Sequence, residues 1–333
     1  MRIHSVLLVC HAGSAVGLGH LSRMLALAEA LAAAGRKPYL LICGDGLSRQ
    51  ELASLPHRFV APDDGLRAEI TRTVAAIQAE AVVFDLHPQR LPGDLAELLD
   101  EFGSRGVRRV AVDGLLAQAP RLDRIWLPSF YLAPELRPAL PAQVRYGWDC
   151  YLLRRHPSPP EWQPGGRVLV LTGGSDAAGL GRLLPRLLDE ALPQWATVCW
   201  VQGPYASPPT LPIAPRLCWS VVQSPQGLGE LLAASGHVLT VYGVSLFESL
   251  QCGRPTVVFS PYGGKDDREL TALAAEDVAV VADGMDAAAA ALTRLMDDAG
   301  RSQRLAAAAR ARMAVDGAAA LAREIVDLLP APA

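Results

Sequence analysis

The feature that most constrains the fold is a repeated alternation of short apolar runs rich in β-branched residues with longer Ala/Leu patterns of helical period. Short buried strands that alternate with amphipathic helices are typical of βαβ units around a parallel sheet. In the first half, the patterns predict strands at 5–10, 38–42, 81–85 and 109–113, and helices at 20–34, 66–78 and 92–104. We therefore expect an α/β domain there.

A Pro/Gly-rich stretch interrupts the alternation near the middle of the chain. Residues 152–166 contain four prolines and two glycines without periodicity, which is typical of a linker. The alternation then restarts, with predicted strands at 167–171, 197–201, 217–221, 237–241, 256–259 and 278–281, and helices at 177–191, 227–234, 246–251 and 268–275. Three Ala-rich helical stretches follow, and the last is a candidate for packing across the domain boundary. The predicted organisation is a domain at 1–153, a linker at 154–166 and a domain at 167–333.

Composition and charge exclude several classes of protein. The chain has 333 residues, half of them hydrophobic, which is enough for two cores. A net charge of −3 with scattered arginines gives no basic surface for nucleic acid. No apolar stretch approaches the ~18 residues of a membrane span, so we expect a cytoplasmic protein and leave contact with a membrane surface open. The six cysteines form no C-x-x-C pair, and we expect reduced, buried thiols.

The segment at 17–23, Gly-Leu-Gly-His-Leu-Ser-Arg, follows the first predicted strand and opens a helix. Gly17 and Gly19 allow a ligand to approach the backbone, and the helix start offers N–H groups and a partial positive charge. That field disfavours an imidazolium ion, so we expect His20 to be a neutral general base at the mouth of the fold. Arg23 either adds positive charge to this site or forms a salt bridge inside the domain.

Polar residues also end two other predicted strands. Asp85 and Asp113 lie at strand carboxyl ends, where ligands bind in open α/β sheets. A helix cap or a turn is an equally good explanation of each. His87 is a candidate second acid/base group or hydrogen-bonding group, although a lone loop histidine is more often neither.

In the second half, the segment Thr-Gly-Gly-Ser-Asp at 172–176 follows a strand and precedes a predicted helix. Backbone amides in this geometry bind phosphate, which makes Gly173, Gly174 and Ser175 candidate ligands. The signal is weak, because such turns are common in α/β proteins. It is neither a Walker loop nor a dinucleotide fingerprint.

The stronger signal is the segment at 242–255, Tyr-Gly-Val-Ser-Leu-Phe-Glu-Ser-Leu-Gln-Cys-Gly-Arg-Pro, between two predicted strands. Its first four residues, Tyr242, Gly243, Val244 and Ser245, offer donors for a diphosphate at a helix start. Glu248 lies one turn later on the face of Ser245, where a carboxylate can accept hydrogen bonds from a ribose diol. The alternative is a capping box of Ser245 and Glu248.

Taken in order, these motifs resemble a family of two-domain nucleotide-sugar enzymes. The series comprises Gly-x-Gly-His-x-x-Arg, Tyr-Gly-x-x-x-Tyr-Leu-Leu-Arg (146–154), Gly-Gly-Ser-Asp, and Gly-x-Ser-x-x-Glu closed by Gly-x-Pro. It is similar to the UDP-sugar hydrolase of pseudaminic acid biosynthesis, to spore-coat polysaccharide proteins and, more distantly, to the glycosyltransferase that forms lipid II. The likeness spans nearly the whole chain.

The resemblance implies a GT-B fold, with two Rossmann-like parallel-sheet domains that face each other across a cleft. It implies that His20 is the base, that Gly173, Gly174, Gly243 and Ser245 surround the diphosphate, and that Glu248 binds ribose. Such enzymes work without a divalent metal or other cofactor, and the chain has no Asp-x-Asp pair.

The chain departs from the hydrolase pattern at two places. Asp85-Leu86-His87 replaces Asp-x-Tyr, and Lys265-Asp266-Asp267-Arg268-Glu269 replaces an Asn-Gln pair, which makes Asp85, His87, Asp266 and Asp267 candidates for contact with a different sugar or acceptor.

The departures favour an inverting glycosyltransferase of surface glycan or glycoconjugate biosynthesis, with a UDP- or CMP-sugar donor and a glycan, protein or lipid-linked acceptor. A nucleotide-sugar hydrolase with water as acceptor is the alternative, because one base serves both reactions. A noncatalytic nucleotide-sugar binding protein is the second alternative, although a binder needs no base. An NAD-linked oxidoreductase is disfavoured by the glycine spacing.

Overall fold

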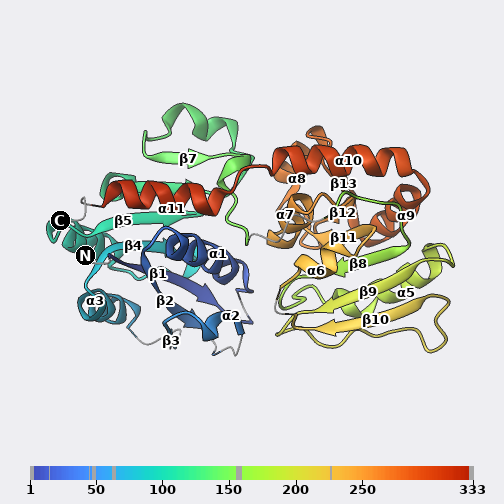
Figure 1. The fold of residues 1–333 in the computed structure, drawn as a ribbon, viewed down its shortest axis with the longest axis horizontal. Coiled ribbons are helices and arrows are strands. Elements are labelled where there is room, and N and C mark those ends of the chain that lie inside the picture. The colour runs from blue at the N-terminus through green and yellow to red at the C-terminus, as the bar shows by residue number, and fades with distance from the viewer. Residues whose placement is uncertain are drawn as a thin grey trace. The chain divides into compact units, whose positions relative to one another are not determined.

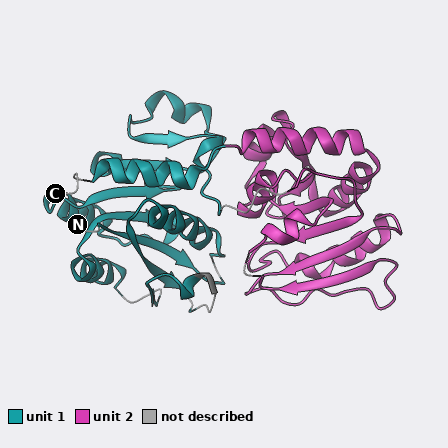
Figure 2. Cartoon of the chain, viewed as in Figure 1, with its two compact units in different colours: residues 1–155, 315–333 teal, residues 156–314 magenta. Residues whose placement is uncertain are grey.

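The computed structural model describes residues 4–14, 16–44, 46, 50–61, 65–154, 160–225 and 227–329. The chain forms two compact units, shown in Figure 2. Unit 1 comprises residues 1–155 and 315–333, and unit 2 comprises residues 156–314. Each unit is a parallel sheet with helices on both faces (Figure 1).

The strands that the structure describes in unit 1 lie in the order β3-β2-β1-β4-β5-β6-β7. Their bounds are β1 (Ser5–Ala12), β2 (Lys37–Gly44), β3 (His57–Val60), β4 (Ala79–Asp85), β5 (Arg108–Val112), β6 (Arg124–Leu127) and β7 (Val144–Tyr146). The α-helices are α1 (Gly19–Ala33), α2 (Gln50–Ala53), α3 (Leu66–Ile77), α4 (Leu95–Ser104) and α11 (Gly317–Leu328), with 3₁₀ turns at Pro88–Arg90, Leu116–Arg121, Pro134–Ala139 and Trp148–Cys150.

Strand β1 shows why this sheet is covered on both faces. Successive side chains of a strand point to opposite faces, and every second residue of β1 belongs to a different core. Val6 and Leu8 pack in the core beneath α1 and α11, whereas Leu7 and Val9 pack in the core beneath α3 and α4. A strand buried on both faces is a continuous apolar run, which is the pattern that the sequence carries.

The strand order of unit 1 reverses between β1 and β4. Both are parallel neighbours, and Cys10 lies opposite Asp85 in their register. The carboxyl ends of β1 and β4 therefore meet at one edge of the sheet. In open α/β sheets this reversal is where ligands bind.

Unit 2 repeats the design with the strand order β10-β9-β8-β11-β12-β13. The strands are β8 (Arg167–Leu171), β9 (Thr197–Gln202), β10 (Cys218–Gln223), β11 (His237–Val241), β12 (Thr256–Phe259) and β13 (Val280–Val281). The α-helices are α5 (Leu184–Ala191), α6 (Gly229–Ala233), α7 (Val244–Gln251), α8 (Asp267–Ala275), α9 (Gly284–Asp297) and α10 (Ala299–Arg312), and a 3₁₀ turn spans Leu180–Arg182. Here the order reverses between β8 and β11, which pair in parallel.

The predicted fold class is confirmed, and the differences lie in short or terminal elements. Strands β3, β6 and β7 have at most four residues each and were not predicted. The predicted helix at 177–191 is wrong in its first half, because Asp176 and Gly179 have positive φ values of 44° and 66° and α5 begins only at Leu184. Five cysteines are buried free thiols as expected, whereas Cys218 is exposed.

The chain end returns to unit 1. Helix α11 contributes Leu321 and Ile325 to the core beneath α1, and residues 315–333 therefore belong to unit 1 although the predicted second domain ran from 167 to 333.

Of the predicted linker, residues 155–159 lie outside the described residues. Trp162 is buried and donates from Nε1 to the Gly236 carbonyl at 2.6 Å, so this part of the stretch packs on unit 2.

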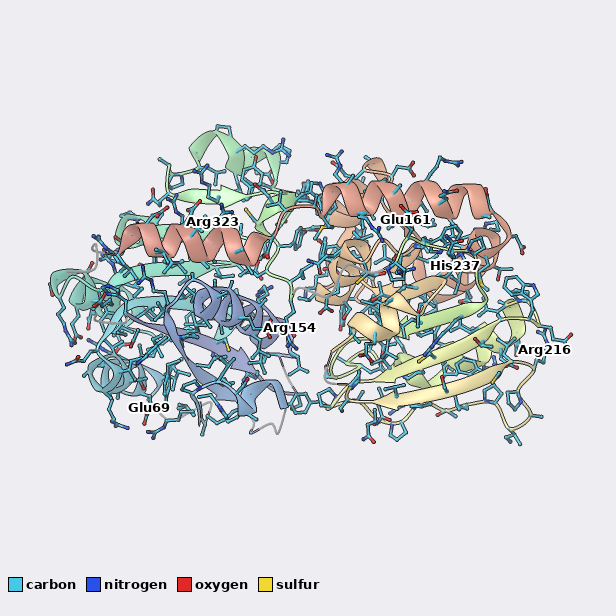
Figure 3. The ribbon with its side chains drawn as sticks, in the orientation of Figure 1. Glu69, Arg154, Glu161, Arg216, His237 and Arg323 are labelled. Atoms are coloured by element: carbon cyan, nitrogen blue, oxygen red, sulfur yellow. The ribbon has the colours of Figure 1, made fainter. Side chains whose placement is uncertain are left out.

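One buried titratable group marks the interior of unit 2. His237, labelled in Figure 3, begins β11 and its Nε2 lies 3.1 Å from the Ser302 hydroxyl of α10. Burial lowers the pKa of His237 to about 4.

Within the described part of the chain, no helix combines the length and apolar character that crossing a bilayer requires.

Candidate functional site

The loop between β1 and α1 places His20 at the reversal of the unit 1 sheet. The Gly13 N–H donates to the Gly17 carbonyl at 3.2 Å, and the Gly17 N–H donates back to Gly13 at 2.8 Å, which closes a tight loop. Gly17 has φ 73°, a conformation that favours glycine. Helix α1 then begins at Gly19, so His20 lies in its first turn, with 13% of its side chain exposed.

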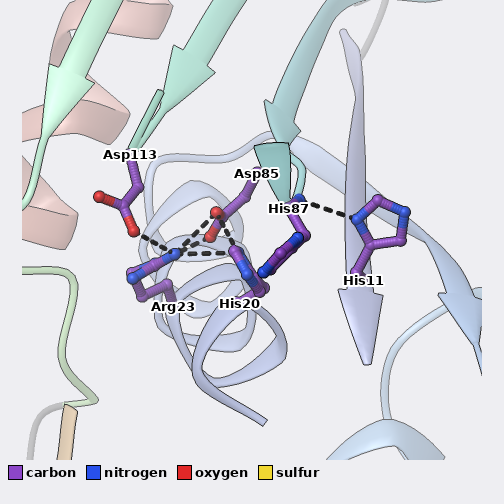
Figure 4. A network of polar contacts seen from close by, with 6 residues as sticks. All are labelled: His11, His20, Arg23, Asp85, His87 and Asp113. Atoms are coloured by element: carbon purple, nitrogen blue, oxygen red, sulfur yellow. Dashed lines mark hydrogen bonds and ion pairs between the residues drawn. The ribbon is translucent and has the colours of Figure 1, made fainter. Parts of the chain in front are cut away.

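His20 contacts a carboxylate from the neighbouring strand. Its Nδ1 lies 2.6 Å from Asp85 Oδ1, at the end of β4. Arg23, one turn along α1, donates to both oxygens of the same carboxylate, from Nε at 2.9 Å and from Nη2 at 2.8 Å. Figure 4 shows these groups converging on Asp85. The sequence left open whether Arg23 adds positive charge to the site or forms a salt bridge inside the domain. In the structure, Arg23 forms salt bridges with carboxylates of unit 1.

A second carboxylate completes this network. Arg23 Nη2 lies 2.8 Å from Asp113 Oδ2 (Figure 4). Asp113 follows β5 and has φ 57°, a left-handed conformation that aspartate tolerates better than most residues. Arg23 is thus held by two carboxylates. Together the three side chains carry one net negative charge beside the imidazole.

The protonation of Asp85 decides which nitrogen of His20 is available. Asp85 is fully buried, which raises its pKa, but the charge of Arg23 and hydrogen bonds from Arg23 and His20 outweigh burial, and the net pKa lies below its usual range. An ionised carboxylate only accepts hydrogen bonds. We therefore assign the proton between them to His20 Nδ1, which also lies 3.0 Å from Arg23 Nη2. With Nδ1 as the donor, a neutral ring presents its lone pair at Nε2.

Two further histidines lie at the same edge. The rings of His20 and His87 meet edge-on with centroids 6.1 Å apart. The His87 N–H donates to His11 Nδ1 at 2.9 Å, which fixes the backbone of the β4 loop against β1 (Figure 4). Burial, followed by the nearby charges of His20, Arg90 and His87, lowers the pKa of His11 to about 4. His11 is therefore a neutral acceptor at pH 7.

In unit 2, the loop after β8 differs from its prediction. The residues after Gly173 and Gly174 do not lead directly into an α-helix. Asp176 instead accepts hydrogen bonds from the N–H groups of Leu180 at 3.0 Å and Gly181 at 2.9 Å, which stabilises the 3₁₀ turn. The Gly174 carbonyl accepts from the Tyr205 N–H at 3.0 Å. Any phosphate contact of Gly173, Gly174 and Ser175 would come from loop amides and not from a helix end.

The loop after β11 does lead into a helix. Gly243 is the residue that precedes α7, and Val244 is its first residue. Ser245 therefore lies inside the first turn, so the capping box of Ser245 and Glu248 does not form. Helix α7 has no side-chain cap and no acidic residue in its first turn, which leaves a positive field for an anion. Because β8 and β11 are neighbours, this loop and the loop after β8 share one edge.

The loop after β12 carries the other two predicted residues of unit 2. Asp266 precedes α8 and accepts a hydrogen bond from the Ser260 hydroxyl at 2.5 Å. Asp267 is the first residue of α8, where a carboxylate is stabilised by the helix dipole. Both acidic residues have a structural explanation. Asp266 and Asp267 remain candidates for sugar contact only by position.

The predicted residues thus form two groups, one in each unit. Unit 1 gathers Gly17, Gly19, His20, Arg23, Asp85 and His87. Unit 2 gathers the predicted residues of the loops after β8, β11 and β12 along one sheet edge. His11 was not among the predicted site residues, although its place next to the end of the first predicted strand was a usable signal. Among the described residues, no group of three His, Cys, Asp or Glu side chains could hold a metal ion.

No protein-family model and no curated protein sequence matches the chain. Several solved structures match its fold over nearly the whole length. MurG of Acinetobacter baumannii is 14% identical, with a TM-score of 0.64 over 97% of this chain and 99% of that one. The spinosyn rhamnosyltransferase SpnG, solved with thymidine diphosphate, is 17% identical, with a TM-score of 0.60 over 97% and 100%. A putative UDP-N-acetylglucosamine 2-epimerase from Listeria monocytogenes is 13% identical, with a TM-score of 0.60 over 98% and 95%.

These likenesses define the fold of the chain. Two Rossmann-like units, each a parallel sheet between helices, match GT-B glycosyltransferases from end to end. The chain therefore has the GT-B fold.

Proposed function

We propose that the chain is an inverting glycosyltransferase that moves a sugar from a nucleotide-activated donor to an acceptor hydroxyl. The observation that carries the proposal is the contact between His20 Nδ1 and the buried, ionised Asp85, which leaves Nε2 as a proton acceptor at a sheet edge. A binding protein has no use for such an oriented base. Unit 2 would hold the donor, with the α7 start and the neighbouring glycine loop at the phosphates and Glu248 at the ribose.

In this reaction, the acceptor oxygen attacks the anomeric carbon while its proton moves to His20 Nε2. The bond between that carbon and the phosphate oxygen breaks on the opposite face, and the nucleoside phosphate leaves with the electron pair. Asp85 compensates the charge of the imidazolium ion as it forms. A positioned base of this kind contributes about 10²- to 10⁴-fold, and amide donors that stabilise the leaving phosphate add to it.

Arg23 has a positioning role in this proposal. Its guanidinium is paired with Asp85 and Asp113, so it keeps Asp85 ionised and in place for His20. Replacement of the charged pair by neutral side chains would free the imidazole to rotate. The proposed donor is a nucleoside diphosphate sugar, which is consistent with the thymidine diphosphate in the SpnG structure, and a CMP-sugar is the alternative. The proposed product is a surface glycan or glycoconjugate.

The test is a ligand screen followed by product analysis. A ligand that binds only the native state raises the melting temperature, so UDP, TDP, GDP and CMP compounds are compared by thermal shift. We expect one base to be preferred and its sugar conjugate to be consumed. Transfer to an added acceptor supports the proposal, whereas release of free sugar at the same rate without acceptor would identify a hydrolase that uses the same base. The absence of a shift with every nucleotide would contradict the proposal.

A further inference from the structure

The predicted nucleotide-binding residues of unit 2 lack a positive charge. Glycines, Ser175, Tyr242, Val244 and Ser245 are neutral, and Glu248 is an acid. A nucleoside diphosphate is an anion of more than one charge, and protein phosphate sites commonly add a lysine or arginine to their backbone donors. A cation from another part of unit 2 would add to the positive field that the start of α7 already provides.

The loop after β12 lies next to the proposed phosphate loop. Strands β11 and β12 are parallel neighbours, and the Tyr242 N–H donates to the Phe259 carbonyl at 3.0 Å, where both strands end. Ser260 then fixes the loop. Its hydroxyl donates to Asp266 at 2.5 Å and accepts from the Tyr262 N–H at 3.2 Å.

The same loop turns a lysine back over an exposed aromatic ring. Gly263 and Gly264 have φ values of 51° and 74°, which reverse the chain without the strain that a side chain would cause. The Lys265 ammonium then lies 5.3 Å from the centroid of the Tyr262 ring, a cation–π contact. Tyr262 is 46% exposed, so both groups are open to a ligand.

Lys265 has no competing anion among the described residues. None of them forms an ion pair with it, although two aspartates follow it in sequence. Asp266 is engaged by Ser260, and Asp267 lies in the first turn of α8. Burial, followed by the charges of Asp266 and Asp176, raises the pKa of Tyr262.

The chemistry of lysine suits this position. The chain has only two lysines, Lys37 and Lys265, among 31 basic residues. An ammonium is a compact charge on a flexible stem that follows a moving phosphate, whereas arginine is better suited to fixed, bidentate pairs. Arg23, by contrast, makes such a fixed, bidentate pair with Asp85.

We propose that Lys265 binds the distal phosphate of a nucleoside diphosphate donor, the phosphate that carries the sugar, from its place over the Tyr262 ring. The assignment rests on the proposed function, in which unit 2 binds the donor. Lys265 then neutralises the charge that grows on this phosphate as the sugar leaves.

Calorimetric titration of the full-length protein with UDP and UMP, or with the corresponding pair for the preferred base, tests the assignment. Lys265→Met is expected to raise the Kd of the diphosphate about 10- to 100-fold, the range for a lost charged hydrogen bond, and to change that of the monophosphate less than about threefold. Lys265→Arg should recover most of the diphosphate affinity. Lys37→Met, which removes the other lysine at an exposed position in unit 1, is the matched control and should change neither Kd.

Three results would overturn the assignment. The first is an unchanged diphosphate Kd in Lys265→Met when the wild-type protein binds the diphosphate. The second is an equal loss for the monophosphate and the diphosphate, which would place the lysine at the proximal phosphate. The third, no nucleotide binding by the wild-type protein, would reject the proposed function itself and is thereby distinguished from the other two.

Discussion

At the scale of single residues, the orientation of His20 depends on groups far away in sequence. Asp85 is 65 positions from His20, and it is itself held by Arg23. The sequence identified each of these residues as a candidate, because each lies in a motif or at a strand end. Their contact was not predictable from local pattern, since it requires knowing that β1 and β4 are neighbours.

Replacement of Asp85 by asparagine should separate catalysis from binding. The amide keeps the shape of the carboxylate but cannot compensate an imidazolium ion, so we expect kcat to fall about 10²- to 10⁴-fold. The nucleotide Kd should stay within about twofold of the wild-type value, because Asp85 belongs to unit 1. Steady-state kinetics with calorimetry measure both, and an unchanged kcat would remove Asp85 from the mechanism.

The pair of Arg23 with Asp85 should also matter for stability. Removal of one partner from a buried ion pair leaves an uncompensated charge and costs about 3–5 kcal/mol. Arg23→Met should lower the free energy of unfolding by about this amount, and the double variant with Asp85→Leu should recover part of the loss.

Arg67→Met is the matched control for Arg23→Met. Arg67 pairs with Asp94 on the surface, where their side chains are 34% and 41% exposed, so water and salt screen the pair and its loss should change the stability far less. Denaturant unfolding compares the variants. Equal effects of the two arginine replacements would contradict the view that the buried network stabilises unit 1.

At the scale of elements, the long buried strands and amphipathic helices were predictable, and the short edge elements were not. Strand β1 and helix α1 each carry a clear apolar period. Strand β3 has four residues, three of them at least partly exposed, so its sequence has no apolar run to detect. The break before α5 arises from the positive φ of Asp176, which sequence alone does not disclose.

Gly44 offers a test of the packing between β1 and β2. A Cβ atom at this position would lie 1.7 Å from the carbonyl oxygen of Ala12, so the two strand ends could not keep their register. We expect Gly44→Ala to destabilise unit 1 by about 3 kcal/mol or more.

Gly93→Ala is the control for Gly44→Ala. A Cβ atom at Gly93 meets no heavy atom within 4 Å, so this change should alter the free energy of unfolding by less than about 0.5 kcal/mol. Urea unfolding of both variants gives the comparison, and a mild effect of Gly44→Ala would show that the strand ends can shift.

At the scale of the whole molecule, the chain end ties the stability of unit 1 to residues that follow unit 2. Helix α11 buries Leu321 and Ile325 fully in the core beneath α1, and Ala318 and Ala322 almost fully, and Leu329, just after the helix, is almost fully buried as well. Burial of a leucine or isoleucine side chain contributes about 1.5–3 kcal/mol, so the helix contributes a large part of the ~5–15 kcal/mol that stabilises a domain.

Deletion of residues 315–333 should therefore unfold unit 1 and leave unit 2 folded. Hydrogen exchange measured by mass spectrometry should show loss of protection in β1 and β4 and retained protection in β8 and β11. Retained protection in β1 would contradict the assignment of α11 to the core of unit 1.

Both units should lose stability in mild acid, because each buries a neutral histidine. Burial lowers the pKa values of His11 and His237 to about 4, and nearby positive charge adds to the effect at His11. A histidine in the unfolded chain has a pKa of ~6.5. Between these values the unfolded state binds more protons, so stability falls as the pH drops from about 6.5 to about 4, by up to about 3 kcal/mol for each histidine.

The variant His237→Gln tests the contribution of unit 2. Glutamine does not titrate, so the pH dependence of hydrogen exchange in β11 should become flatter, while that of β1 should be unchanged. An identical pH dependence in the variant would show that His237 does not carry the effect.

The most direct test of the whole account is the turnover of a saturating nucleotide-sugar donor by His20→Ala. We expect product formation to fall at least about 100-fold, while the nucleotide Kd, measured on the same preparation, matches that of the wild-type protein. Turnover at the wild-type rate would contradict the role of His20 and, with it, the proposed glycosyl transfer.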